Sequence, residues 1–128
     1  MTSLEKIFGP IIHQVTREDL VRDGILVDVS TLAAEAGLRF PVCVGRTVWD
    51  AYVEVPPGVI GQDETGRLWD ILWMLAAAIR RGAVGDTIHF QVYVRNDNRR
   101  PRSVRLKAAC SPGDSAEPVI TILMPDED

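Results

Sequence analysis

The chain has 128 residues, of which 46% are hydrophobic and 25% are charged, and its formal net charge is −4. This length and composition predict a single globular domain over residues 1–128 that can bury a real core. Two cysteines and two histidines without a Cys-x-x-Cys motif argue against a disulfide framework and a structural zinc site, so we expect no metal and no cofactor.

The N-terminal half predicts short elements between extended segments. No stretch at its start is cationic and then apolar, so we expect a cytoplasmic protein. The expected order begins with a loosely ordered lead-in over 1–10, a strand over 11–15, and a helix capped by Thr16 and closed by Gly24. A strand over 25–29 and a helix over 31–36, capped by Ser30, follow. An extended segment over 40–44 then leads to a helix capped by Thr47. Pro56-Pro57-Gly58 then begins a loop.

The segment from Asp63 to Gly82 predicts a long helix with little polar face. Asp63 is suited to the N-cap, and Gly82 follows two arginines as a stop. Its apolar residues lie on several adjoining faces, so we expect a central core helix with Trp69 and Trp73 buried. The alternative is that Trp69, Trp73 or Met74 stays partly exposed as a binding surface for a partner. The remaining narrow stripe consists of Arg67, Asp70, Met74, Ala77 and Arg81. The apolar run is too short and too flanked by charge to span a bilayer.

After Gly85 the apolar residues recur every second position, which predicts strands. We expect one strand over 88–95, a turn-rich link over 96–101, a second strand over 104–110 and a last strand over 119–124, followed by an acidic tail over 125–128. The expected fold is therefore α+β: a three-stranded antiparallel C-terminal sheet packed on one long central helix, with short N-terminal helices and extended segments.

Charge is unevenly distributed along the chain. The segment from Arg95 to Lys107 contains six cations and one acid, a net charge of +5 on a chain of net charge −4. Such a patch is typical of a solvated hairpin, and it also suits contact with something anionic or with an opposite patch on a second copy. The candidate partner-binding residues are Tyr93, Arg95, Arg99, Arg100, Arg102, Arg105 and Lys107.

Catalytic motifs are absent from the sequence, including the phosphate-binding loops, Gly-x-Ser-x-Gly and His-Glu-x-x-His. A Cys110–His89 pair could form a nucleophile, but strand alternation should place the thiol inward and the imidazole outward. His13 beside Asp28 suits an acid–base pair or a hydrogen-bonded structural histidine. We therefore assign no catalytic residue.

Four segments together carry a resemblance to a known family: residues 17–29, 40–42, 62–74 and 112–122. The most specific is Gln-Asp-x-x-Gly-Arg-Leu-Trp-Asp-x-Leu-Trp-Met, which begins at Gln62. From Ile11 onward the chain resembles a small family of uncharacterised bacterial proteins, a domain of unknown function typically encoded on plasmids, integrative elements and prophages. The resemblance implies a mobile-element accessory protein, and it transfers no site residue.

The function expected from these features is non-enzymatic protein–protein binding, in which the chain inhibits a host nucleic-acid-targeting defence complex of the CRISPR or restriction type. One alternative is a nucleic-acid-binding protein that uses the basic hairpin over 95–107. A second alternative is a small Cys/His enzyme. A homodimer is also considered, because the strand over 119–124 could lie at a sheet edge.

Overall fold

The computed structural model describes residues 15–128. The expected lead-in, the strand over 11–15 and the His13–Asp28 pair thus rest on residues outside the described part. The helices are α2 (Arg17–Arg22), α3 (Ser30–Glu35), α4 (Arg46–Val48), the π-helix η1 (Trp49–Val53) and α5 (Glu64–Arg80). The strands are β1 (Leu26–Asp28), β2 (Val42–Gly45), β3 (Thr87–Val94), β4 (Arg102–Pro112) and β5 (Pro118–Leu123).

The strands form one five-stranded sheet in the order β1-β2-β5-β4-β3. The expected α+β class and the antiparallel meander β3-β4-β5 are confirmed. The prediction of a sheet with only three strands is wrong, because β2 pairs in parallel with β5 and extends the sheet to β1. The strand over 119–124 is therefore an interior strand, and it offers no free edge for a homodimer.

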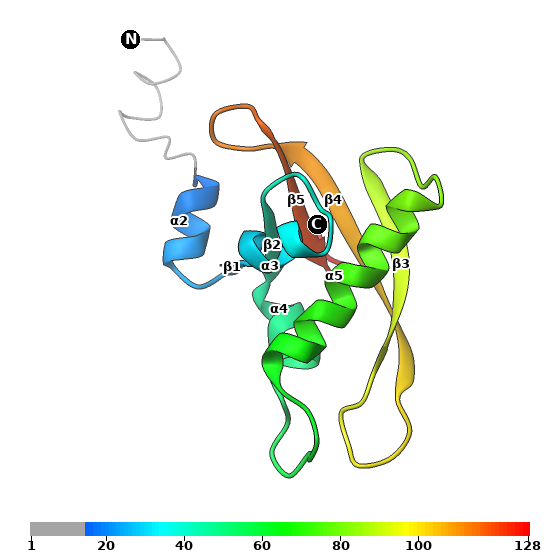
Figure 1. Ribbon diagram of the computed structural model, residues 1–128. Helices are drawn as coiled ribbons and strands as arrows, with labels where there is room; N and C mark the ends of the chain where they lie inside the picture. Colours follow the sequence, from blue (N-terminus) through cyan, green and yellow to red (C-terminus); the bar gives the residue numbers. More distant parts are fainter. Residues whose placement is uncertain (1–14) are drawn as a thin grey trace, which may run out of the picture.

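The long helix α5 crosses one face of this sheet (Figure 1). Its fully buried residues Ile71, Leu72 and Leu75 pack in one core with Leu106 and Ile122 of the sheet. Asp63 caps the helix through a 2.6 Å bond from the Gly66 amide, as the sequence predicted. Burial of these large apolar side chains, each contributing roughly 1.5–3 kcal/mol, holds the helix on the sheet.

Two expectations about α5 are wrong. Trp73 is 46% exposed and Trp69 is half-buried, so the tryptophans lie at the rim of the core rather than inside it. Their rings stack at 5.7 Å, and the Arg80 guanidinium lies 4.9 Å from the Trp73 ring. Arg67, expected on the polar stripe, is only 6% exposed. The helix therefore buries a cation and exposes an aromatic residue.

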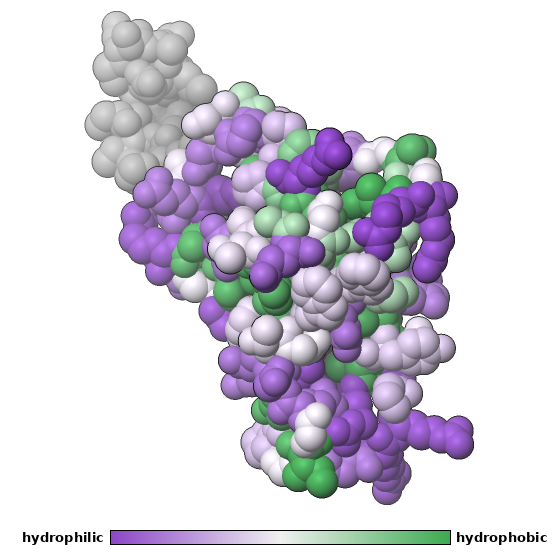
Figure 2. Space-filling view, viewed as in Figure 1, coloured by the Kyte–Doolittle hydropathy of each residue, from purple (hydrophilic) through white to green (hydrophobic). Residues whose placement is uncertain are grey.

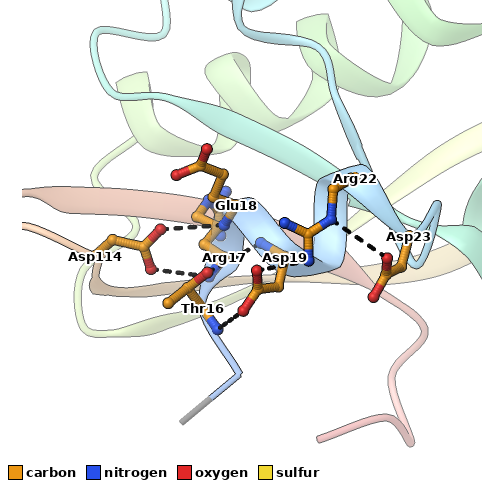
Figure 3. Close-up of polar contacts among 7 residues, drawn as sticks. All are labelled: Thr16, Arg17, Glu18, Asp19, Arg22, Asp23 and Asp114. Atoms are coloured by element: carbon orange, nitrogen blue, oxygen red, sulfur yellow. Dashed lines mark hydrogen bonds and ion pairs between the residues drawn. The ribbon is translucent and has the colours of Figure 1, made fainter. Parts of the chain in front are cut away.

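The short helix α2 lies on the other face of the sheet. Its first turn leaves four amides without a helical partner, and all four are bonded by carboxylate or hydroxyl oxygens (Figure 3). The expected cap at Thr16 is confirmed, and Thr16 and Asp19 bond reciprocally in a capping box, while Asp114 accepts from the amides of Arg17 and Glu18 at 2.8 and 3.1 Å. The β4–β5 loop thus fixes α2 across 97 residues of sequence.

The expected caps of α3 and α4 are wrong. Ser30 is the first helical residue of α3, and its hydroxyl accepts a bond from the Val42 amide instead. Gly45 takes the N-cap position of α4, which places Thr47 inside that helix. At α3 the Asp28 carboxylate accepts from the Ser30 amide at 2.9 Å, so a local side chain still caps this helix, but it is Asp28 and not Ser30. At α4 the Arg46 amide bonds the Ile25 carbonyl at 2.8 Å, so there a tertiary contact takes the role expected of a local cap.

Candidate functional site

Two loops lie side by side at one end of the molecule (Figure 1). They are residues 54–63 before α5 and residues 95–101 between β3 and β4. Asn98 bonds both ways, accepting from the Ile60 amide at 3.0 Å and donating to the Gly58 carbonyl at 2.9 Å. We call this region the hairpin end, defined by residues 54–63, 95–101 and the adjoining Tyr93, Arg102 and Arg105.

The buried Arg67 is the centre of the contacts that hold the two loops together. Its Nη1 donates to Arg95 O at 2.7 Å and to Gln62 Oε1 at 2.8 Å, and its Nη2 donates to Asn96 Oδ1 at 2.5 Å. Its Nε donates to Val53 O at 3.1 Å. Burial, and then the positive charge of Arg95, lower the pKa of the Arg67 guanidinium.

The sequence analysis missed this role for Arg67, although a signal was present. Arg67 stands four residues before Ile71 and eight before Leu75, the spacing of one helix face. Both of those residues are fully buried. The planar guanidinium can bond several oxygens at once, so it suits a site that must join two loops to a helix.

Two of the seven predicted binding residues are engaged inside the protein. Arg95 is half-buried, donates to Asp97 O at 3.1 Å, and also bonds the Ile60 carbonyl. Lys107 bonds the backbone carbonyl of Glu127 in the acidic tail. Both side chains therefore contribute to the fold, and they are poor candidates for contact with a partner.

The other five predicted residues are exposed on the hairpin end: Tyr93, Arg99, Arg100, Arg102 and Arg105. Tyr93 is 71% exposed. The register pairs Tyr93 with Ser103 and Gln91 with Arg105, so Tyr93 and Arg105 share the sheet face opposite α5. Arg102 pairs with the buried Val94 and lies on the α5 side. The cations thus surround the end of the hairpin.

Positive charge at the hairpin end is not neutralised by neighbouring acids. The salt bridges within residues 15–128 join Arg22 to Asp19 and Asp23, and Arg46 to Asp50. None of the six cations from Arg95 to Lys107 has a carboxylate within 4.0 Å in this part of the chain. Hydrophilic side chains dominate the lower end of the surface in Figure 2, around one small hydrophobic patch.

A cavity of about 760 Å³ adjoins the hairpin end and reaches around the first turns of α5. Tyr93, Arg95 and Pro101 line one part of it, and Trp69 and Tyr52 line another. Partial burial raises the pKa of the Asp70 carboxyl, which also lines this cavity. The lining therefore mixes aromatic rings with both signs of charge, as a polar recognition surface does.

The residues proposed for chemistry do not come together. Ile88 pairs with Ala108, which places Cys110 on the core side of the sheet, whereas His89 pairs with Lys107 on the opposite face. The register therefore separates the thiol from the imidazole, and the proposed Cys/His pair is not formed. Among the described residues no three His, Cys, Asp or Glu side chains are grouped closely enough to hold a metal ion.

The helices described here include none with the length and apolar character needed to cross a membrane. Comparison with protein families matches residues 7–128 to the Family of unknown function (DUF6573). No curated protein and no solved structure shows significant similarity to the chain.

Proposed function

The chain belongs to this family of unknown function, and we propose that it acts by binding a partner protein through the hairpin end rather than by catalysis. The contact residues would be Tyr93, Arg99, Arg100, Arg102 and Arg105. The partner would present an acidic surface, because the side chains offered to it are four arginines and one tyrosine. Tyrosine and arginine are also the residue types that most often dominate binding energy at protein interfaces.

The observation that carries this proposal is the set of unpaired arginines on an acidic protein. With eighteen acids and fourteen basic residues in the chain, neighbouring carboxylates could neutralise this patch, yet none lies within 4.0 Å in residues 15–128. A concentrated positive patch on a negative protein orients it toward an acidic surface and speeds their encounter.

The second support is that hydrogen bonds connect the two loops of the hairpin end. Arg67, Arg95 and Asn98 tie its loops together through bonds to backbone oxygens and side-chain amides. A fixed loop loses less conformational entropy on binding than a flexible one. The arginines are therefore presented by a scaffold suited to recognition.

The proposal also concerns the identity of the partner. The resemblance to proteins of plasmids, integrative elements and prophages suggests a host nucleic-acid-targeting defence complex, of the CRISPR or restriction type, which the chain would inhibit in the cytoplasm. That step rests on the genetic setting of similar proteins rather than on the geometry.

The test is affinity capture from a bacterial lysate with a hairpin variant and a charge-matched control. The hairpin variant carries Arg99→Ser, Arg100→Ser and Arg102→Ser. The control carries Arg22→Ser, Arg46→Ser and Arg81→Ser, which removes the same charge from exposed positions outside the hairpin, together with the surface ion pairs of Arg22 and Arg46. We expect a specific partner to bind the native protein and the control, and to bind the hairpin variant at least tenfold more weakly, which is about 1.4 kcal/mol.

Equal capture by the two variants would show that the hairpin arginines do not recognise the partner. Light scattering of the purified protein tests whether two copies of the chain associate through their oppositely charged surfaces. If a dimer forms in low salt and dissociates in the hairpin variant, the acidic surface belongs to a second copy of the chain.

Nucleic-acid binding is the second candidate function. It is favoured by Tyr93 and Arg105 on the sheet face opposite α5, where both are exposed and where a base could stack and a phosphate could bind. A surface that binds single strands usually stacks bases on several aromatic side chains, and within residues 15–128 this face offers one, Tyr93. Nucleic-acid binding is therefore a weaker proposal than protein binding. A gel-shift assay at low salt tests it, and we expect no shift with single-stranded DNA or RNA. A shift that disappears in the hairpin variant would favour this function instead.

A further inference from the structure

A second cavity, of about 310 Å³, lies at the other end of α5 from the hairpin end. The loop between α3 and β2 forms one wall, the C-terminal end of α5 with residues 83–85 forms another, and β3, β4 and β5 form the floor. In Figure 1 this loop passes beside the upper part of α5. In Figure 2 hydrophobic surface reaches solvent in this region and is bordered by hydrophilic side chains.

The interior of the cavity is apolar and is lined by buried residues. Leu75 is fully buried, and Leu38, Ala108 and Ile120 are 4–6% exposed. Large apolar side chains also stand at the mouth, where Phe40 is 44% exposed and Ile79 is 38% exposed. Such a site gains affinity by removing apolar surface of a ligand from water.

The charged residue that lines the cavity is positive. Arg39 is exposed and, among residues 15–128, is the only charged residue that lines the cavity. The Arg80 guanidinium lies beside the same loop, 3.8 Å from the position that a Cβ on Gly37 would occupy. Neither arginine is within 4.0 Å of a carboxylate in the described part of the chain. Asp86 is next to this site, since its carbonyl accepts a bond from the Cys110 amide at 2.7 Å, but it does not line the cavity.

We infer that this cavity binds a small amphipathic anion, with an aliphatic or aromatic body inside it and a carboxylate at Arg39. A volume of 310 Å³ equals that of about ten water-sized groups, which suits a body of about eight to ten carbons. The apolar walls recognise the body, and Arg39 distinguishes an acid from the corresponding alcohol or amine. This inference is independent of partner binding at the hairpin end.

Octanoate is the probe, and octanol and octylammonium are its matched controls. In titration calorimetry we expect one octanoate to bind each chain, at least tenfold more tightly than octanol does. Octylammonium should bind more weakly than octanol. Affinity should rise about fourfold for each added methylene from hexanoate to octanoate, and it should stop rising once the body exceeds the cavity.

Cys110 gives a second measurement, because its thiol lines the cavity and is half-buried, whereas Cys43 is 3% exposed. Bound octanoate should slow alkylation of Cys110 by N-ethylmaleimide, followed by mass spectrometry, and should leave the slow alkylation of Cys43 unchanged. Octylammonium at the same concentration should give no protection.

Three variants make the inference falsifiable. Arg39→Gln should weaken octanoate binding about tenfold and leave octanol binding unchanged, while Arg22→Gln on α2 should change neither. Ala83→Leu, at an exposed position of the lining, should block all three probes without unfolding the protein.

Equal binding of octanoate and octanol, or no effect of Arg39→Gln, would refute the preference for an anion. Absence of both binding and Cys110 protection would refute the site itself. If the probes fail but Ala83→Leu abolishes capture of a protein partner, the cavity receives a side chain of that partner and the inference is wrong.

Discussion

Replacing Arg67 with methionine tests the reasoning about the hairpin end most directly. Methionine keeps an unbranched apolar stem but removes four bonds, to Val53 O, Gln62 Oε1, Arg95 O and Asn96 Oδ1. The stability change follows from what each lost partner can do afterwards. Arg95 O still accepts a bond from Gln62 Nε2 at 3.0 Å, and the exposed Asn96 can bond water.

The Val53 carbonyl is the fully buried group left without a partner, since Val53 is 0% exposed, while the half-buried Gln62 loses the donor to its Oε1. An unsatisfied buried carbonyl costs roughly 1–3 kcal/mol, and each lost bond to a charged donor costs roughly 1.5–3 kcal/mol before compensation. Removing the buried cation returns part of this, because its desolvation penalty of several kcal/mol disappears. We therefore expect the free energy of unfolding to fall by about 2–4 kcal/mol.

Urea unfolding followed by tryptophan fluorescence measures this change. Arg81→Met is the matched control, at the exposed C-cap residue of α5, and should lower the free energy of unfolding by less than about 1 kcal/mol. Arg67→Lys should lose most of the stability that Arg67→Met loses, because one ammonium group cannot reach acceptors on both loops and on η1. In Arg67→Met the Ile60 amide, which bonds Asn98, should also exchange its hydrogen faster.

A loss below about 1 kcal/mol in Arg67→Met, equal to the control, would refute the reasoning. Full stability in Arg67→Lys would refute it differently, by showing that the positive charge matters and the geometry of the guanidinium does not. Either result would also remove the support that a fixed hairpin end gives to the proposed function.

Three further predictions concern α2 and the thiols. Asp114→Ala should lower the free energy of unfolding by about 1 kcal/mol and speed proteolysis before α2, because two first-turn amides lose their acceptor; unchanged proteolysis would contradict this. The bonds from Thr16 lower the pKa of Asp19, so its stabilising effect is complete above the unfolded pKa near 4 and is lost as pH falls through the folded pKa. Asp19→Asn should therefore flatten the fall of the urea midpoint between pH 5 and about pH 3, and an unaltered slope would contradict the assignment. Burial raises the pKa of Cys43, so N-ethylmaleimide should modify Cys110 first in the native protein, and equal rates would show that the sheet opens readily.

Local signals predicted much of the fold. Thr16 with Asp19, Asp63 and Gly82 mark helix ends that the structure confirms, because caps depend on residues three or four positions away. The alternation after Gly85 likewise predicted β3 and β4 and the face on which Tyr93 lies. The sequence could do this because turns, caps and strand periodicity are set by neighbouring residues.

What the sequence by itself determined is therefore an α+β chain with a long capped helix, a C-terminal meander and a basic hairpin. Only the tertiary structure decided that β2 pairs with β5, since parallel pairing joins segments nearly 80 residues apart with no local signal. The tertiary structure also decided which cations remain available to a partner. Arg67 and Arg95 have the same chemistry as Arg99 and Arg100, and only the packing of two distant loops makes the first pair structural and leaves the second pair exposed.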